Sequence, residues 1–304
     1  MKFGGIRRKA TAWAVAASAL LSGAAWANPH PWQLNLPQGV TQTSHEVWDL
    51  NMASFLICVG IGIVVFGAMI IAMIRFRKSR GAVAEKWSHS TKLELVWTIV
   101  PVLILVGLAW PATDVLVKTA NTSGSQMTIK VTGYQWKWRY DYLDYMGKPV
   151  AKVGFMSRLA HDSDVTRQLD SGLNPYNVKA PDGTNDYLLD VDHPLVVPVG
   201  VKIRFLVTGG DVIHSWWVPD LGWKMDAIPG IVNAAWTEIS TPGTYRGQCA
   251  ELCGQDHGFM PIVVKAVPKA QFEQWLAAKE SAAKLDKAAR TAQADSSTHG
   301  ESQG

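Results

Sequence analysis

The stretch Gly247-Gln248-Cys249-Ala250-Glu251-Leu252-Cys253-Gly254-Gln255-Asp256-His257-Gly258-Phe259-Met260 gathers two thiols, an imidazole and a thioether. Their spacing is Cys-x3-Cys-x3-His-x2-Met, and a second imidazole, His214, lies upstream in Asp211-Val-Ile-His-Ser-Trp-Trp. Soft thiolate and thioether ligands with imidazole favour copper over the hard cations. A single blue-copper ion needs one Cys, two His and a weak axial Met, so this stretch holds one thiolate too many. Two coppers that share both thiolates, each with one His, would use every strong ligand.

Two other interpretations stay open on the residues alone. Cys249 and Cys253 could form a short-loop disulfide, since the segment is expected to face an oxidising compartment. Four soft ligands could also hold tetrahedral zinc. The disulfide leaves His257, Met260 and His214 without a role, and zinc rarely recruits Met.

Residues from Asp211 to Met260 closely resemble the copper-binding region of subunit II of haem-copper cytochrome c oxidases, and the resemblance extends over roughly residues 45 to 268. At Ile231 relatives often carry a basic residue, so an ion pair there is not expected. The matching pieces, in order, are Asp211-Val-Ile-His-Ser-Trp, Val218-Pro-Asp-Leu-Gly, Asp226-Ala-Ile-Pro-Gly, Gly247-Gln-Cys-Ala-Glu-Leu-Cys-Gly and His257-Gly-Phe-Met-Pro.

The resemblance implies a dinuclear copper centre of the CuA type. Both cysteines would bridge the two coppers, with one imidazole and one weaker donor completing each ion. It also implies that the Glu251 side chain reaches a magnesium ion at the border with subunit I. The implied copper ligands are Cys249 and Cys253 as bridges, His214 and Met260 on one copper, and His257 and the carbonyl of Glu251 on the other.

The resemblance also implies a landing site for cytochrome c. Trp136 matches an exposed ring at which electrons enter, although strand alternation would instead bury it on an aromatic face. Asp141, Asp192 and Asp211 match acidic positions around the site where basic cytochrome c docks. Any one of these acids taken alone is better explained as a solvated surface group, whereas together they should steer the donor.

At the start of the second apolar run, Glu94 and His89 match the mouth of a proton channel that leads into subunit I. Ionisable groups beside membrane spans often mark proton paths, because their charge is costly unless it is used or paired. The alternative is that Glu94 only marks the membrane boundary and pairs with Lys92.

The formal charge of +4 is concentrated in two places. Lys2, Arg7, Arg8 and Lys9 lie at the N-terminus, and six further positive residues lie between Arg75 and Lys92. From residue 115 to residue 268 there are 14 basic and 15 acidic residues. No basic excess remains there to attract a polyanion, so nucleic acid is not an expected partner.

Residues 1–27 have the pattern of a signal peptide, with a basic start, an apolar run from Ala10 to Leu21 and an A-x-A site ending at Ala27. That run is too short for a bilayer core of about 30 Å, which argues against a first span. Cleavage after Ala27 would leave a mature chain with a net charge near zero.

Two apolar runs predict a transmembrane hairpin within residues 28–114. Met52–Ile74 and Leu95–Thr113 are free of charged side chains until Asp114 and would be about 34 and 28 Å long as helices, enough to span a lipid bilayer. The loop between them carries six Lys and Arg against two Glu, so the positive-inside rule predicts that it is cytoplasmic. The flanks, and everything after the second span, then lie in the periplasm of a bacterial inner membrane.

Residues 115–268 predict an all-β domain. Aromatic and polar side chains alternate from Tyr134 to Tyr142, which indicates a strand with one aromatic face. Short strands separated by Gly and Pro are typical of a sandwich or barrel, and the resemblance sharpens this to a cupredoxin fold. Residues 156–185 are polar and irregular and predict a surface insertion. The other predicted strands are Leu188–Val191, Leu195–Val199, Lys202–Thr208, Ala235–Ser240 and Ile262–Val267.

Residues 269–304 predict a helix to about Arg290 and a disordered polar tail from Thr291 to Gly304. No Cys-x-x-Cys-His occurs, so no c-type haem is expected in this chain.

The expected function is therefore that of an oxidase subunit which takes electrons from cytochrome c and passes them to the haems of subunit I, for dioxygen reduction coupled to proton pumping. Two other classes stay open. The chain could be a copper-free structural subunit of a quinol oxidase, which would lack the thiols, or a copper-delivery protein, which would need an exposed Cys pair.

Overall fold

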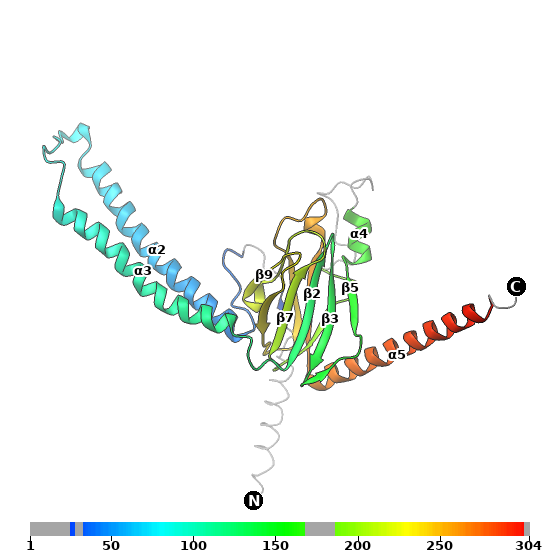
Figure 1. The fold of residues 1–304 in the computed structure, drawn as a ribbon. Coiled ribbons are helices and arrows are strands. Elements are labelled where there is room, and N and C mark those ends of the chain that lie inside the picture. Colours follow the sequence, from blue (N-terminus) through cyan, green and yellow to red (C-terminus); the bar gives the residue numbers. More distant parts are fainter. Residues whose placement is uncertain (1–24, 28–32, 168–185, 301–304) are drawn as a thin grey trace, which may run out of the picture.

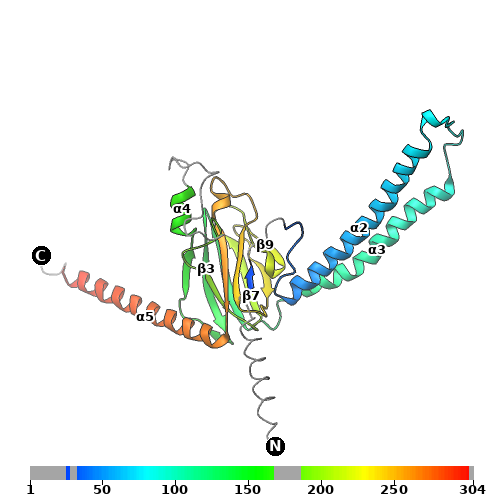
Figure 2. The same cartoon turned by 180° about the vertical axis from the view of Figure 1, so that it is seen from behind.

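A computed structural model describes residues 25–27, 33–167 and 186–300. The predicted signal segment lies outside the described residues except for Ala25–Ala27, which form strand β1 and pair in parallel with β11 (Gly243–Cys249). Two long helices lead into a domain of two packed sheets, and a third long helix leaves that domain on the other side (Figures 1 and 2). This is the predicted fold class, a two-helix hairpin followed by a β-sandwich.

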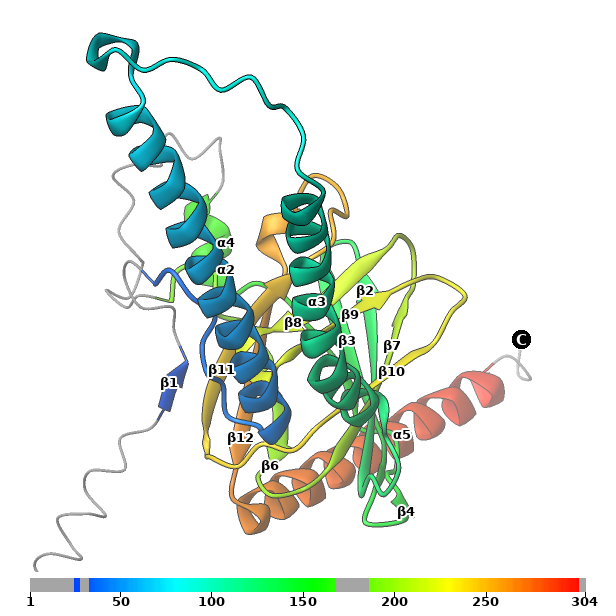
Figure 3. The ribbon, with the colours of Figure 1, turned by 90° about the vertical axis from the view of Figure 1, so that its left-hand side faces the viewer.

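The hairpin consists of α2 (Gln42–Arg75) and α3 (Thr91–Ala120), which lie side by side (Figure 3). Both are long and apolar enough to cross a membrane, and their apolar windows are not buried inside the protein. At its start α2 has a capping box, in which Thr41 and Ser44 exchange side-chain and backbone hydrogen bonds. The basic loop between the helices contains one short 3-10 turn, η1 (Lys78–Arg80).

The sandwich is built from two six-stranded sheets. Its interior is rich in aromatic rings, and Phe205, Trp216 and Trp223 form a cluster in which each ring contacts the other two. One sheet holds β2 (Met127–Tyr134), β3 (Lys137–Tyr145), β4 (Lys148–Pro149), β5 (Gly154–Ser157), β7 (Ile203–Gly209) and β10 (Asn233–Thr237). The other holds β1, β6 (Leu195–Pro198), β8 (His214–Val218), β9 (Trp223–Ala227), β11 and β12 (Pro261–Val267).

Two strand predictions were wrong. The run from Tyr134 to Tyr142 is not one strand, because β2 ends at Tyr134, Gln135 and Trp136 form a turn, and β3 begins at Lys137. The alternation of aromatic and polar side chains continues across this tight hairpin, so the sequence pattern did not reveal the turn. Residues 188–191 form a turn and a single bridge from Val191 to Leu159, since Leu188 adopts a positive φ of 63° that a strand does not allow.

The predicted insertion contains regular structure at its start. Residues 156 and 157 belong to β5, and α4 (His161–Arg167) follows. The remainder of the predicted insertion, 168–185, lies outside the described residues. Where the described chain resumes at Asp186, the guanidinium of Arg246 in β11 donates a hydrogen bond to the Asp186 carboxylate at 2.7 Å. This ion pair ties Asp186 to the sandwich.

The C-terminal helix α5 (Lys269–Gly300) begins on the sandwich, where Phe272 and Trp275 contact the ring of Tyr142. It then projects away from the domain (Figure 2). The prediction of disorder from Thr291 was wrong as far as Gly300, because the helix continues to that residue.

A set of hydrogen bonds joins the hairpin to the sandwich. The Thr41 hydroxyl donates to the Leu221 carbonyl at 3.2 Å in η3 (Pro219–Leu221), close to the start of α2. At the end of α3, the Trp236 indole N–H donates to the Lys118 carbonyl at 3.0 Å. The Lys202 ammonium donates to the carbonyls of Asn121 and Ser123 at 2.9 and 2.7 Å. We call this set of contacts the junction.

Candidate metal centre

The predicted copper ligands come together at one end of the sandwich. His214 is the first residue of β8, Cys249 the last of β11, His257 opens the short turn η4 (His257–Phe259), and Met260 directly precedes β12. Antiparallel pairing of β11 with β8 sets Cys249 opposite Trp216, two residues after His214. Strand ends and one loop therefore position all the ligands.

The sulfur and nitrogen atoms of these residues face one another. The Sγ atoms of Cys249 and Cys253 are 3.9 Å apart, and Cys249 Sγ is 4.0 Å from His214 Nδ1. Cys253 Sγ lies 3.5 Å from both His257 Nδ1 and Met260 Sδ. Both cysteines are free thiols, because their Sγ–Sγ distance is far longer than the ~2.05 Å of a disulfide bond.

The carbonyl of Glu251 also points at the centre, since Cys249 Sγ lies 3.3 Å from its oxygen. The Glu251 side chain is exposed. Cys249, Cys253 and His214 form a group whose ligand atoms all lie within 4.8 Å of one another. Two thiols, two imidazoles, a thioether and a carbonyl fit copper, because this donor set is soft and has no hard carboxylate in it.

Burial shields the centre from water. His214, Met260, Cys253 and Cys249 are 0, 1, 4 and 6% exposed, whereas His257 is half-buried. Burial opposes ionisation of the Cys249 thiol, but its contact with His214 holds its pKa below the usual value. Burial and the neighbouring Cys249 raise the pKa of Cys253 to about 12. Because metal binding needs thiolates, loading the site must release a proton from Cys253.

Asp211 orients His214 through the second ring nitrogen. His214 Nε2 lies 2.9 Å from Asp211 Oδ1, while Nδ1 faces the sulfur. The backbone N–H groups of Gln135 and Val212 also donate to this carboxylate at 2.7 Å. Burial disfavours its charge, yet these hydrogen bonds lower the pKa of Asp211 overall. A carboxylate on the outer nitrogen of a ligating His is a common way to fix the ring.

Three residues around the centre were missed from the sequence. Gly133 of β2 lies against the His214 ring, where a Cβ would approach ring carbons to 2.7 Å. Gln135 Nε2 donates to the Cys253 carbonyl at 2.9 Å. The fully buried Trp138 donates its N–H to the Met260 carbonyl at 3.3 Å and contacts the His214 ring edge. Alternation predicted a buried Trp138, but only the fold shows what it touches.

The other predicted site residues are spread over the molecule. Trp136 is half-buried in the hairpin turn, and its ring lies close to Gly254, directly after Cys253. Asp141 forms a bidentate ion pair with Arg139, and Asp192 accepts a hydrogen bond from the backbone N–H of Arg158 at 2.8 Å. Only Trp136 and Asp211 of the predicted docking residues are joined to the centre by the contacts above.

At the far end of the hairpin, Glu94 lies in the first turn of α3. Its carboxylate contacts His89 Nδ1 at 2.7 Å, and not Lys92, which was the alternative partner. Both side chains are partly exposed. The two residues matched to a proton-channel mouth are therefore neighbours in space.

Comparison with known proteins agrees over both halves of the chain. The periplasmic domain of cytochrome c oxidase subunit II matches residues 127–267, and the transmembrane domain of the same subunit matches residues 29–115. A probable cytochrome c oxidase subunit 2 of Rickettsia conorii is 38% identical over 257 residues, covering 84% of this chain and 74% of that protein. Cytochrome c oxidase subunit 2 of Mycosarcoma maydis is 34% identical, covering 82% and 91%.

Among solved structures, the periplasmic domain of subunit II of the Bradyrhizobium japonicum cytochrome oxidase is similar. It is 37% identical, covers 53% of this chain and 98% of that one, and has a TM-score of 0.43.

The fold and the site define a membrane-anchored protein with two transmembrane helices, a periplasmic β-sandwich domain and a His/Cys/Cys group suited to a CuA-type copper site. The chain belongs to the cytochrome c oxidase subunit II family, and is part of a haem-copper oxidase complex.

Proposed function

We propose that this subunit accepts electrons from cytochrome c at a dinuclear CuA centre and passes them to the haem-bearing subunit I, which reduces dioxygen to water and pumps protons. The observation that carries the proposal is the convergence of two thiols, two imidazoles, a thioether and a carbonyl in one buried place. When bound, the copper pair supplies a one-electron carrier whose charge is shared by two ions.

The side chains keep structural change at this centre small. Cys249 and Cys253 stand between the imidazoles of His214 and His257, the arrangement that bridging thiolates need. Trp138 and Gln135 hold the ligand loop by its carbonyls, and Asp211 holds the His214 ring. Rigid strands and exclusion of water lower the reorganisation that each electron transfer requires.

The two other function classes are less well supported. A copper-free subunit of a quinol oxidase has no need of the six converging donors. A copper-delivery protein needs accessible thiols, whereas both cysteines here are nearly inaccessible.

For electron entry we propose Trp136, because its ring lies beside the ligand loop at the tip of the β2–β3 hairpin. Asp192 and Asp211 remain proposed docking acids for a basic cytochrome c, together with Asp141, whose charge is offset by Arg139. Trp136→Ala should slow electron uptake from cytochrome c while copper content stays unchanged. An unchanged uptake rate would leave Trp136 a packing residue.

The exposed Glu251 side chain is proposed to contribute to a magnesium site shared with subunit I, since its carbonyl already faces the copper ligands.

We infer the location of the protein from the charge of the loop between the two helices. A bacterial inner membrane would hold the hairpin, with the basic loop in the cytoplasm. There Glu94 and His89 would admit protons, so Glu94→Ala should slow turnover but not copper reduction, and Glu85→Ala in the same loop should change neither.

The decisive experiment counts copper in the purified oxidase complex. Wild type should hold two coppers in this subunit with the near-infrared absorption of a mixed-valence pair. Cys249→Ser should leave at most one, because a bridging thiolate serves both ions. One zinc and no copper in the wild-type subunit would refute the proposal.

A further inference from the structure

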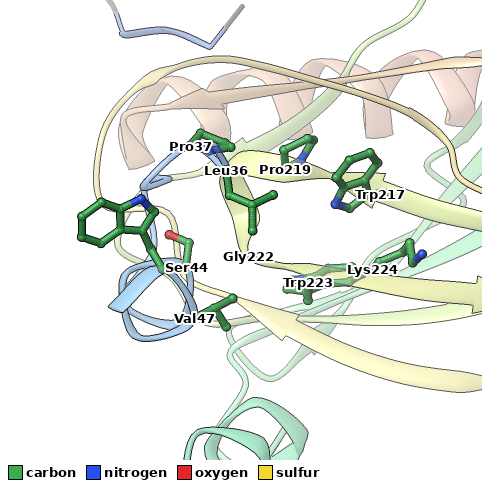
Figure 4. Close-up of a pocket in the computed structure, with 10 residues that line it drawn as sticks. Leu36, Pro37, Ser44, Val47, Trp217, Pro219, Gly222, Trp223 and Lys224 are labelled. Carbon is green, nitrogen blue, oxygen red and sulfur yellow. The ribbon is translucent and has the colours of Figure 1, made fainter. Parts of the chain in front are cut away.

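A small pocket lies where the hairpin meets the sandwich (Figure 4). Three segments form its walls: the chain before α2, the first turns of α2, and the connection from β8 to β9. Its volume of about 170 Å³ is below the roughly 300–1,000 Å³ of sites that enclose a drug-sized molecule. It can therefore hold one part of a larger molecule.

The pocket is held firmly by the fold. Gly222 adopts a φ of +80°, and a Cβ there would approach the Ser44 backbone to 2.5 Å, so α2 packs directly on the β8–β9 connection. The Val40 N–H donates to the Asp220 carbonyl at 3.0 Å beside it. These two contacts fix the start of α2 against the β8–β9 connection, so the pocket is a permanent feature of the region where the hairpin meets the sandwich.

Its lining combines apolar walls with one cation. Leu36, Val47, Trp48 and Trp217 supply aliphatic and aromatic surface. Lys224 also lines the pocket, is exposed, and forms no ion pair among the described residues. An apolar wall beside an unpaired ammonium suits an amphiphile with an acidic group.

The lower end of the pocket, at Trp48, lies at the height of the headgroup layer of a membrane, and Ser44 lies above that layer. The uncharged run of α2 starts at Met52, so Trp48 lies about 6 Å and Ser44 about 12 Å above the hydrocarbon core, at 1.5 Å per residue. Headgroup layers are roughly 5–7 Å thick on each side. Trp side chains at this level are typical interface anchors.

We propose that this pocket binds the phosphate and glycerol backbone of one anionic phospholipid from the outer leaflet. Lys224 pairs with the phosphate, and Trp48 and Trp217 flank the glycerol. The acyl chains then run down the exposed apolar side of α2, where residues such as Phe55 and Leu56 are 56 and 61% exposed. The lipid would fill the space between membrane anchor and periplasmic domain.

The test counts lipid retained by the purified oxidase complex in native mass spectrometry, after delipidation and titration with phosphatidylglycerol. Lys224→Ala removes the cation, and Val47→Trp fills the pocket. Lys265→Ala removes another exposed lysine, which is on β12 and does not line the pocket, and serves as the control. Copper content reports whether each variant is folded.

Wild type and Lys265→Ala should retain one tightly held lipid on this subunit. Lys224→Ala should bind it about tenfold more weakly, the effect of losing one hydrogen bond to a charged group, and Val47→Trp should lose it. Unchanged binding in both variants would overturn the proposal. So would equal competition by glycerol phosphate, which would indicate a site for a free anion, or a wild-type pocket that takes up no lipid because another subunit fills it.

Discussion

The function of the sandwich depends on both the copper centre and the junction, but the two regions are encoded differently in the sequence. Five of the six proposed copper ligands lie between Cys249 and Met260, and only His214 comes from elsewhere. The junction hydrogen bonds join residues 79 to 180 positions apart, such as Lys202 with Ser123 and Thr41 with Leu221. A local cluster of rare ligand types is visible in a sequence, whereas a long-range contact between ordinary residues is not.

The difference also concerns tolerance to change. At the copper centre four of the six donor residues are nearly inaccessible and each donor atom has a defined neighbour, so small displacements cost much. At the junction most groups are partly exposed, and water can replace a lost partner. Substitutions at the centre should therefore act on metal binding itself, and those at the junction on how the domain is held.

The largest effect is expected from Gly133→Ala. The added Cβ would lie only 2.7 and 2.9 Å from two ring carbons of His214 and would push this ligand out of place. Displacing a ligand or its support lowers metal affinity by at least about tenfold. Copper content and the near-infrared band of the purified complex measure this loss.

Gly258→Ala is the matched control. Gly258 lies within the ligand loop, yet a Cβ there meets nothing within 4 Å. Copper should stay bound in that variant. Equal copper loss in both variants would mean that glycine is needed for backbone freedom, and not for the approach of the His214 ring.

Much of the fold and of the copper centre could be predicted from the sequence. The ligand motif, both spans and the alternating strand residues carry local signals, and the sandwich follows from them. The turn at Gln135 and Trp136 was missed because aromatic alternation ran unbroken through it. Gly133, Trp138 and Gln135 were missed as supports of the centre because their roles depend on which strands become neighbours.

A smaller effect is expected at the junction from combining Lys202→Met with Trp236→Phe. These changes remove the hydrogen bonds to carbonyls at the end of α3 and keep much of the side-chain volume. Because these three hydrogen bonds are exposed and water can replace the lost partners, a total loss of ~0.5–1.5 kcal/mol is expected. If the junction sets the orientation of the domain, that loss should reduce the competent population roughly two- to tenfold. Electron transfer from copper to haem, followed by flash photolysis, should slow by that factor.

Copper content and electron uptake from cytochrome c should not change in this double variant, which separates it from damage to the copper centre. Lys265→Met, on an exposed face of β12, controls for loss of a surface charge. A normal rate from copper to haem in the double variant would show that contacts with other subunits alone hold the domain.

The smallest effect concerns Asp220, in η3 on the sandwich side of the junction. Burial raises the pKa of its carboxyl above the ordinary 3.8. The folded state therefore binds this proton more tightly than the unfolded state, so stability falls as pH rises from about 4 through the raised pKa. Asp220→Asn keeps the shape without the charge, and should raise the melting temperature of the sandwich slightly at pH 7 but not at pH 4. Near-UV circular dichroism of the full chain in detergent measures the melting temperature at both pH values. A variant that is less stable at pH 7 would mean that the Asp220 carboxylate is a needed ionic partner at the junction, which would make this contact as specific as those of the copper centre.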